Sequence, residues 1–148
     1  MSEDTAAPRE HRPWHLWLVG VLGTLWNLVG AFDYISTQTR NQSYMSQFTP
    51  EQLEFFYGFP SWVVAFWALA VWGGVLGTVL LLFRKRLAVG VLLVSFLSMI
   101  VTFIHNFGFS NGFEVVGGVG LAFSGLIFVF AFGFWFYARA MTRVGVLA

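Results

Sequence analysis

Two apolar stretches of the sequence carry polar side chains that could bind a small solute. The first stretch contains Asn27, Asp33 and Tyr34, and the second contains His105 and Asn106. Polar groups inside apolar segments are unfavourable unless they find partners, so these residues are the candidates for a binding site. An Asp33–His105 pair could titrate near neutral pH and support proton-coupled binding. The alternative is that these groups only form hydrogen bonds between helices or contact headgroup water.

Helical periodicity arranges these residues in two polar stripes. The first comprises Gly20, Gly23, Thr24, Asn27, Ala31 and Tyr34, and the second Ser95, Ser98, Thr102, His105 and Asn106. Because polar stripes avoid lipid, we expect the two to meet in the interior of a helix bundle. From the helical rise, Asn27 lies roughly 16 Å deep, near the membrane midplane, and His105 lies roughly 27 Å along its helix, at the outer boundary.

Patterns typical of enzymes and metal sites are missing from the sequence. The chain has no cysteine, which excludes disulfides and thiolate ligands. His11 and His15 fall at the opposite membrane face from His105, so the histidines do not gather as haem or metal ligands. The glycines of 117–120 lack the preceding strand and the spacing of a dinucleotide motif. We therefore expect no catalytic activity and no cofactor.

The composition indicates a membrane protein. Of the 148 residues, 57% are hydrophobic and only 10% are charged, whereas soluble domains carry about a quarter charged residues. Asp, Glu, Lys and Arg are absent from four runs, 13–32, 55–83, 87–113 and 115–138. Each run is long enough to cross a bilayer as a helix. We predict an all-α membrane protein, a bundle of four transmembrane helices at about 15–35, 61–83, 87–108 and 115–137.

The basic residues predict the orientation. Seven of the eight lie at one end of the predicted helices, and Arg40 lies at the other. By the positive-inside rule, both termini are cytoplasmic. The predicted organisation is a disordered tail (1–12), a transmembrane domain (13–138) and a second cytoplasmic tail (139–148). The alternative, a cleaved signal peptide in place of the first span, would leave three spans and an exterior N-terminus.

The outer loop, 36–59, is the longest polar segment and predicts a short interfacial helix. Thr49 is a candidate N-cap, Pro50 suits the first helical position, and Gln52 completes a capping box. Gly58 marks the end of this helix. The loop is either a cover on the membrane surface or a lid over an outward-facing cavity.

Small residues four apart predict close helix packing. Gly73 and Gly77 form such a pair in the second span, and Gly118–Ala122 and Gly120–Ser124 do so in the fourth. These pairs let helix backbones approach each other where lipid removes the hydrophobic force. They serve either the packing of one bundle or the contact between copies in a homo-oligomer.

Several motifs resemble a family of small four-span bacterial membrane proteins that are often labelled as sugar transporters. Leu-Trp-Asn-Leu-Val-Gly at 25–30 precedes Asp33 and Tyr34, Trp-Gly-Gly-Val-Leu-Gly occupies 72–77, and Ser-Asn-Gly-Phe-Glu occupies 110–114. The resemblance covers the first three spans and implies a location in the bacterial inner membrane.

We therefore predict an inner-membrane protein that binds or transports a small polar solute such as a sugar. Asn27 would lie at the midplane of the path, and Asp33, Tyr34, His105 and Asn106 at its mouth. Trp26 or Trp62 could stack on the ring of a sugar. The alternative is a non-transporting structural or accessory subunit of a larger membrane complex. The lipid bilayer is the expected partner in both cases, and the net charge of +1 gives no reason to expect nucleic acid.

Overall fold

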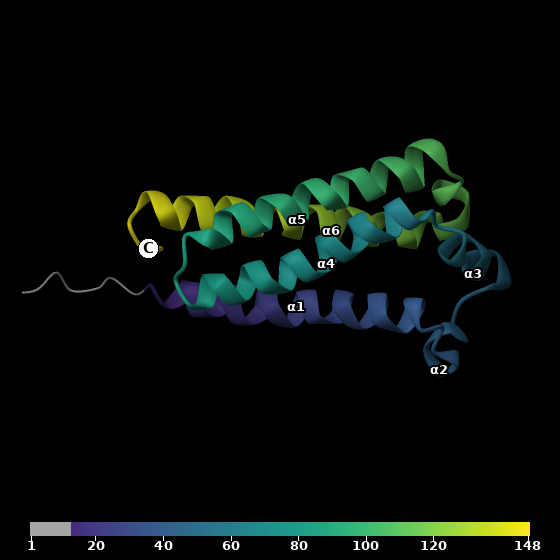
Figure 1. The fold of residues 1–148 in the computed structure, drawn as a ribbon, viewed down its shortest axis with the longest axis horizontal. Coiled ribbons are helices and arrows are strands. Elements are labelled where there is room, and N and C mark those ends of the chain that lie inside the picture. The colour runs from purple at the N-terminus through teal and green to yellow at the C-terminus, as the bar shows by residue number, and fades with distance from the viewer. Residues whose placement is uncertain (1–12) are drawn as a thin grey trace, which may run out of the picture.

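The computed structural model describes residues 13–148, which form the predicted all-α four-helix bundle (Figure 1). The four long helices are α1 (Trp14–Gln38), α4 (Ser61–Leu82), α5 (Leu87–Phe103), which continues as the π-helix η1 (Ile104–Phe109), and α6 (Gly112–Arg143). Two short helices, α2 (Gln42–Met45) and α3 (Pro50–Tyr57), lie between α1 and α4. The predicted tail 1–12 lies outside the described residues.

Four helical stretches, α1, α4, α5 with η1, and α6, are long and apolar enough to cross a membrane. Large apolar side chains on their outer surfaces are exposed, among them Val129 at 62% and Phe32 at 60%. Exposed apolar faces of this extent are stable in contact with lipid rather than with water. The chain is therefore a multi-pass membrane protein whose helices contact lipid.

The fourth helix is longer than the sequence predicted, extending from 112 to 143 instead of from 115 to 137. Basic residues near the C-terminus of a helix interact favourably with its dipole, so Arg139 and Arg143 do not end it. The Arg139 guanidinium also lies over the Trp135 ring, 5.6 Å from its centroid. Residues 139–143 of the predicted second tail therefore belong to α6, and only 144–148 follow this helix.

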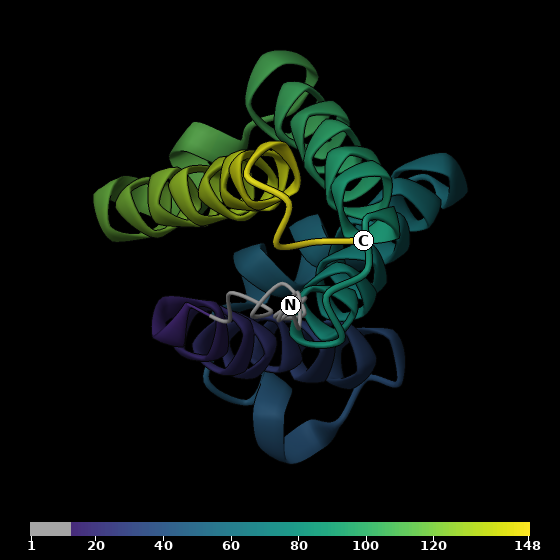
Figure 2. The same cartoon turned by 90° about the vertical axis from the view of Figure 1, so that its left-hand side faces the viewer.

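Helix α4 lies between α1 and α5, and α6 packs along α5 (Figures 1 and 2). The sequence had suggested that the polar stripes of α1 and α5 pack directly on each other. This prediction is wrong, because α4 separates the two helices. Helices α1 and α6 meet through long side chains, such as Trp26 and Phe130, whose ring centroids are 4.7 Å apart. This arrangement leaves interior space between α1, α5 and α6.

The glycines of α4 allow this central position. A Cβ on Gly73 would lie 3.1 Å from the Cβ of Ser95 on α5, and one on Gly74 would collide with the Asn27 side chain of α1. A Cβ on Gly77 would collide with Leu92 of α5. The pair at 73 and 77 therefore serves packing within the bundle, the first of the two predicted uses.

The end of the bundle that contains the turn at 84–86 is tightly packed, and we call it the C-terminal end. Leu81, Ala88 and Ala138 are completely buried there, with Val146 and Leu147 packed against them. The amide of Ala148 donates to the carbonyl of Arg84 at 2.9 Å, and the amide of Arg86 donates to the carbonyl of Ala148 at 2.8 Å. Residues 144–148 therefore close this end of the bundle.

The connection between η1 and α6 depends on Gly112, which is buried. A Cβ at this position would collide with the backbone carbonyl oxygen of Asn106, which cannot move without displacing η1.

We expect Gly112→Ala to lower the free energy of unfolding by about 2 kcal/mol, measured by SDS titration of the purified protein. Gly108→Ala is the control, since its Cβ would lie 3.9 Å from Ile104. Equal stability of the two variants would contradict this account.

Candidate functional site

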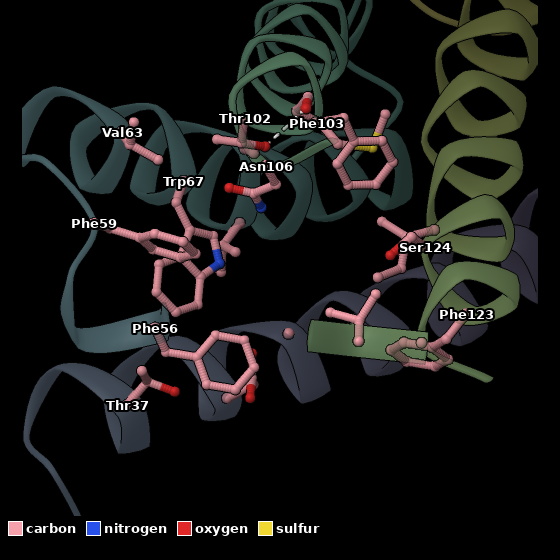
Figure 3. Close-up of a pocket in the computed structure, with 18 of the residues that line it drawn as sticks. Thr37, Phe56, Phe59, Val63, Trp67, Thr102, Phe103, Asn106, Phe123 and Ser124 are labelled. Atoms are coloured by element: carbon pink, nitrogen blue, oxygen red, sulfur yellow. Dashed lines mark hydrogen bonds between the residues drawn. The ribbon is translucent and has the colours of Figure 1, made fainter. Parts of the chain in front are cut away.

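A cavity of about 630 Å³ lies in the half of the bundle that carries α2 and α3, which we call the loop end. All four long helices contribute to its walls, together with α2, η1, α3 and the segments that flank α3. Figure 3 shows Asn106 and Thr102 on one side of this space and Ser124 of α6 on another. Pockets for small molecules typically have volumes of about 300–1,000 Å³, so this cavity is of the right size.

The wall of the cavity is mostly apolar and aromatic, with a few polar groups. The polar lining residues are Asn27, Asp33, Thr37, Tyr44, Gln52, Ser95, Thr102, Asn106 and Ser124. Backbone contacts fix the positions of several of them: Asn27 Nδ2 donates to the Gly23 carbonyl at 2.8 Å, and Ser95 Oγ donates to the Ala70 carbonyl at 2.5 Å. An apolar wall with few, fixed polar groups is typical of sites that bind small molecules.

Asp33 connects α1 to the loop. The Tyr44 hydroxyl on α2 donates to Asp33 Oδ1 at 2.5 Å, and the Tyr44 ring packs edge-on against Phe32. Burial raises the pKa of Tyr44 above its ordinary value of 10, and the hydrogen bond to the Asp33 carboxylate raises it further. At neutral pH Tyr44 is therefore a protonated donor that holds α2 against the cavity.

Three of the five predicted site residues, Asn27, Asp33 and Asn106, line the cavity. Tyr34 lies elsewhere, with its ring edge-on to Trp67 at a centroid distance of 4.9 Å. His105 lines a smaller pocket of about 480 Å³ beside the cavity, and its Nδ1 lies 3.2 Å from Asn106 Oδ1.

The proposed Asp33–His105 pair does not form within the described residues, because Asp33 bonds to Tyr44 and His105 lies against Asn106. The rings of Phe59 and Trp62 also pack edge-on against His105. The two titratable groups belong to two different pockets. Within residues 13–148, no group of three or more His, Asp or Glu residues could hold a metal ion.

Apart from Trp26, the aromatic wall of the cavity was missed by the sequence reasoning. Trp67, Phe56, Phe59 and Phe103 line the cavity (Figure 3), but the sequence contains 18 phenylalanines and 7 tryptophans, and their spacing does not distinguish wall from lipid face. Ser124 was also missed as a site residue, although its small-residue spacing from Gly120 was noted. Both residues of that pair line the cavity.

Helix α3 lies across the loop end of the cavity. The predicted capping box is present: Thr49 accepts from the Gln52 amide, and Gln52 Oε1 accepts from the Thr49 amide. Gln52 Nε2 also donates to the Val115 carbonyl of α6 at 3.4 Å. Because Phe55 and Phe56 of α3 line the cavity, this helix forms part of the cavity wall at the loop end.

Near this contact, α6 has a break at Gly117, where φ is 66° and ψ is −170°. This backbone conformation is accessible essentially only to glycine. The short segment before the break carries Val115, which Gln52 holds, and the segment after it carries Gly120 and Ser124 of the cavity wall. Residues on both sides of the break line the cavity, Val116 before it and Gly120 and Ser124 after it.

The raised pKa of Tyr44 gives a prediction about pH. Because the pKa in the folded protein lies above the unfolded value of 10, the hydrogen bond to Asp33 is fully present below pH 10 and is lost only as the pH rises through the higher value. We expect the phenolate absorbance that distinguishes the native protein from Tyr44→Phe to appear only above pH 10. Its appearance at or below pH 10 would contradict the Asp33–Tyr44 contact.

No protein-family model, no curated protein and no solved structure matches the chain.

Proposed function

We propose that the protein binds a small solute in the cavity at its loop end. The observation that carries this proposal is the cavity of about 630 Å³, whose wall combines aromatic rings with the polar groups of Asn27, Ser95 and Asn106. The opposite end of the bundle is filled by buried side chains. A helix bundle that needed only to be stable would gain from filling both ends.

The charge distribution supports an orientation for this proposal. Within residues 13–148, five of the six basic residues, Arg84, Lys85, Arg86, Arg139 and Arg143, lie at or near the C-terminal end, and Arg40 lies beside the loop end. The positive-inside rule then directs the C-terminal end to the cytoplasm of a bacterium and the cavity to the outer side of the inner membrane. A solute would enter from outside, past α3.

The lining fits a solute that has both an apolar face and polar groups. The sugar that the sequence resemblance implies is one member of this class, because sugar rings stack on aromatic side chains and their hydroxyls bond to amides. Trp26, one of the two tryptophans predicted to stack, lines the cavity, and Trp62 lies with His105 outside it. Transport across the membrane would need a second state in which the C-terminal end opens.

Cysteine protection tests the proposal, because the native chain has no cysteine. We expect a bound solute to slow maleimide labelling of Ser124→Cys, in the cavity wall, in full-length protein in nanodiscs. Gln47→Cys, at an exposed loop position outside the cavity wall, is the control and should label at an unchanged rate. The panel comprises simple sugars, amino acids and organic ions. If no member slows labelling at position 124, the proposal is wrong.

A second candidate function, a packing subunit or homo-oligomer, is favoured by the outer face of α6. In the part of the chain that the structure describes, no atom lies within 4 Å of a Cβ built on Gly118, Gly125 or Gly133. Ala122, at helical spacing from Gly118, is also exposed. Such a stripe is the kind of surface on which membrane helices associate.

Gentle-detergent purification followed by native mass spectrometry tests this candidate. A stoichiometric partner or a homo-oligomer that is lost in Gly125→Leu but kept in Gly90→Leu would support it. Gly90 is a suitable control because it is exposed on α5 and has open space at its Cβ position. A native monomer without partners would show that this face of α6 contacts lipid.

A further inference from the structure

The cavity wall has a single kind of charge. Within residues 13–148, Asp33 is the one charged side chain among the lining residues, and no Lys, Arg or His lines the cavity. A carboxylate in an apolar surrounding is unfavourable unless something compensates its charge. The one hydrogen bond described for it comes from the neutral Tyr44 hydroxyl, which leaves the negative charge itself unbalanced.

Arg40, the basic residue beside the loop end, does not line the cavity. The guanidinium carbon of Arg40 lies 4.3 Å from the centroid of the Tyr57 ring, in a cation–π contact at the loop surface. Arg84, Lys85 and Arg86 lie at the C-terminal end of the bundle. His105 lies in the neighbouring pocket, which also contains Glu51 and Glu54. Within residues 13–148, none of these basic side chains belongs to the cavity wall.

Aromatic rings surround the rest of the space. Trp26 of α1, Trp67 of α4 and Phe56 of α3 line the cavity, and Phe103 of α5 and Phe123 of α6 complete the ring of aromatic side chains. The faces of aromatic rings carry partial negative charge and attract cations, most strongly when water is excluded. A cavity wall with one carboxylate, several aromatic rings and no basic residue favours a positively charged ligand over a negatively charged one.

We propose that the solute is an organic cation with an aromatic or otherwise apolar body, and that Asp33 is its counter-charge; this inference rests on the proposed function. A quaternary cation needs no hydrogen bond, so it can approach Asp33 while Tyr44 keeps its bond to Oδ1. The body of the cation contacts the rings, and α3 covers it. The size of the cavity suits a drug-sized molecule.

Tetraphenylphosphonium and tetraphenylborate are matched probes, because they share shape and size and differ in charge. We expect titration calorimetry of the full chain in nanodiscs, corrected with empty nanodiscs, to show saturable binding of the cation at least about tenfold tighter than that of the anion. Asp33→Asn should remove this preference, and Asp33→Glu should keep it. Glu114→Gln, an exposed carboxylate outside the cavity wall, should leave it unchanged.

The outcomes separate this inference from the proposed function. The inference is overturned if the native protein binds both ions equally, or if Asp33→Asn keeps the full preference. It is also overturned if only a neutral sugar protects Ser124→Cys from labelling, and in that case the proposed function stands. If neither ion nor any solute of the panel protects that cysteine, both are wrong. The comparison of the two ions uses the native chain, so it does not depend on the folding of a variant.

Discussion

Ser124→Trp is expected to weaken the binding of tetraphenylphosphonium roughly a hundredfold, about 2.8 kcal/mol, while the bundle stays folded. Ser124 projects from α6 into the cavity (Figure 3). An indole there would occupy the space of the ligand and contact rings that are already present, so it would not be left exposed to water. The measurement is titration calorimetry in nanodiscs, with the melting temperature as the test of folding.

Leu126→Trp is the matched control for this prediction. Leu126 lies two residues further along α6, is 44% exposed, and does not line the cavity. Its substitution adds the same side chain to the lipid-facing surface and should change the affinity by less than about twofold. If the two variants bind the cation equally well, the cavity is not the binding site.

Gly74→Leu is expected to have the largest effect on stability, lowering the free energy of unfolding by about 3 kcal/mol. Gly74 is buried where α4 crosses α1, and any Cβ there collides with the side chain of Asn27. A leucine would separate the two helices, because the packing contacts that hold membrane helices together decline steeply with distance. Unfolding in SDS, followed by circular dichroism, gives the measurement.

The control for Gly74→Leu is Gly90→Leu. The same side chain at position 90, on the exposed surface of α5, meets open space, so its stability should stay within about 0.5 kcal/mol of the native value. A loss of the same size in both variants would mean that leucine disfavours these helices for reasons other than the contact between α1 and α4.

The sequence was sufficient to predict the four long helices and α3, but not the short helix α2 or the π-helix η1. Apolar length determines where helices can cross a bilayer, and uncharged runs of that length are easily recognised. The cap of α3 was equally predictable, because Thr49, Pro50 and Gln52 act within one turn. These features depend on residues close together in the chain, and for that reason the bounds of the first three spans were nearly correct.

The arrangement of the helices was less predictable, because it depends on which faces come together. Asn27 and Ser95 were both expected in the interior, and both line the cavity. The prediction that their two stripes pack directly on each other was wrong, because the small residues of α4 allow that helix to lie between α1 and α5. The sequence identified the close-packing glycines Gly73 and Gly77 but could not say which neighbours they would meet.

Tyr34, one of the two predicted site residues that lie outside the cavity, illustrates the same difficulty. Tyr34 and Asp33 are adjacent in the chain and at nearly the same depth, yet their side chains point about 100° apart around α1. Asp33 therefore faces the cavity, and Tyr34 packs on Trp67 and Trp72 of α4. Depth was estimated from the rise per residue, whereas membership of the site depends on rotation about the axis.

If the protein transports its solute, the hydrogen bonds that join Ala148 to Arg84 and Arg86 would have to be counted among the contacts that limit the rate of transport. A continuous pore conducts without rearrangement, but here transport would require the packed C-terminal end, where Val146 and Leu147 are buried, to open and close again. Flux would then saturate at the frequency of that rearrangement, with one solute moved per cycle. Single-channel current steps would be absent, and turnover would rise steeply with temperature.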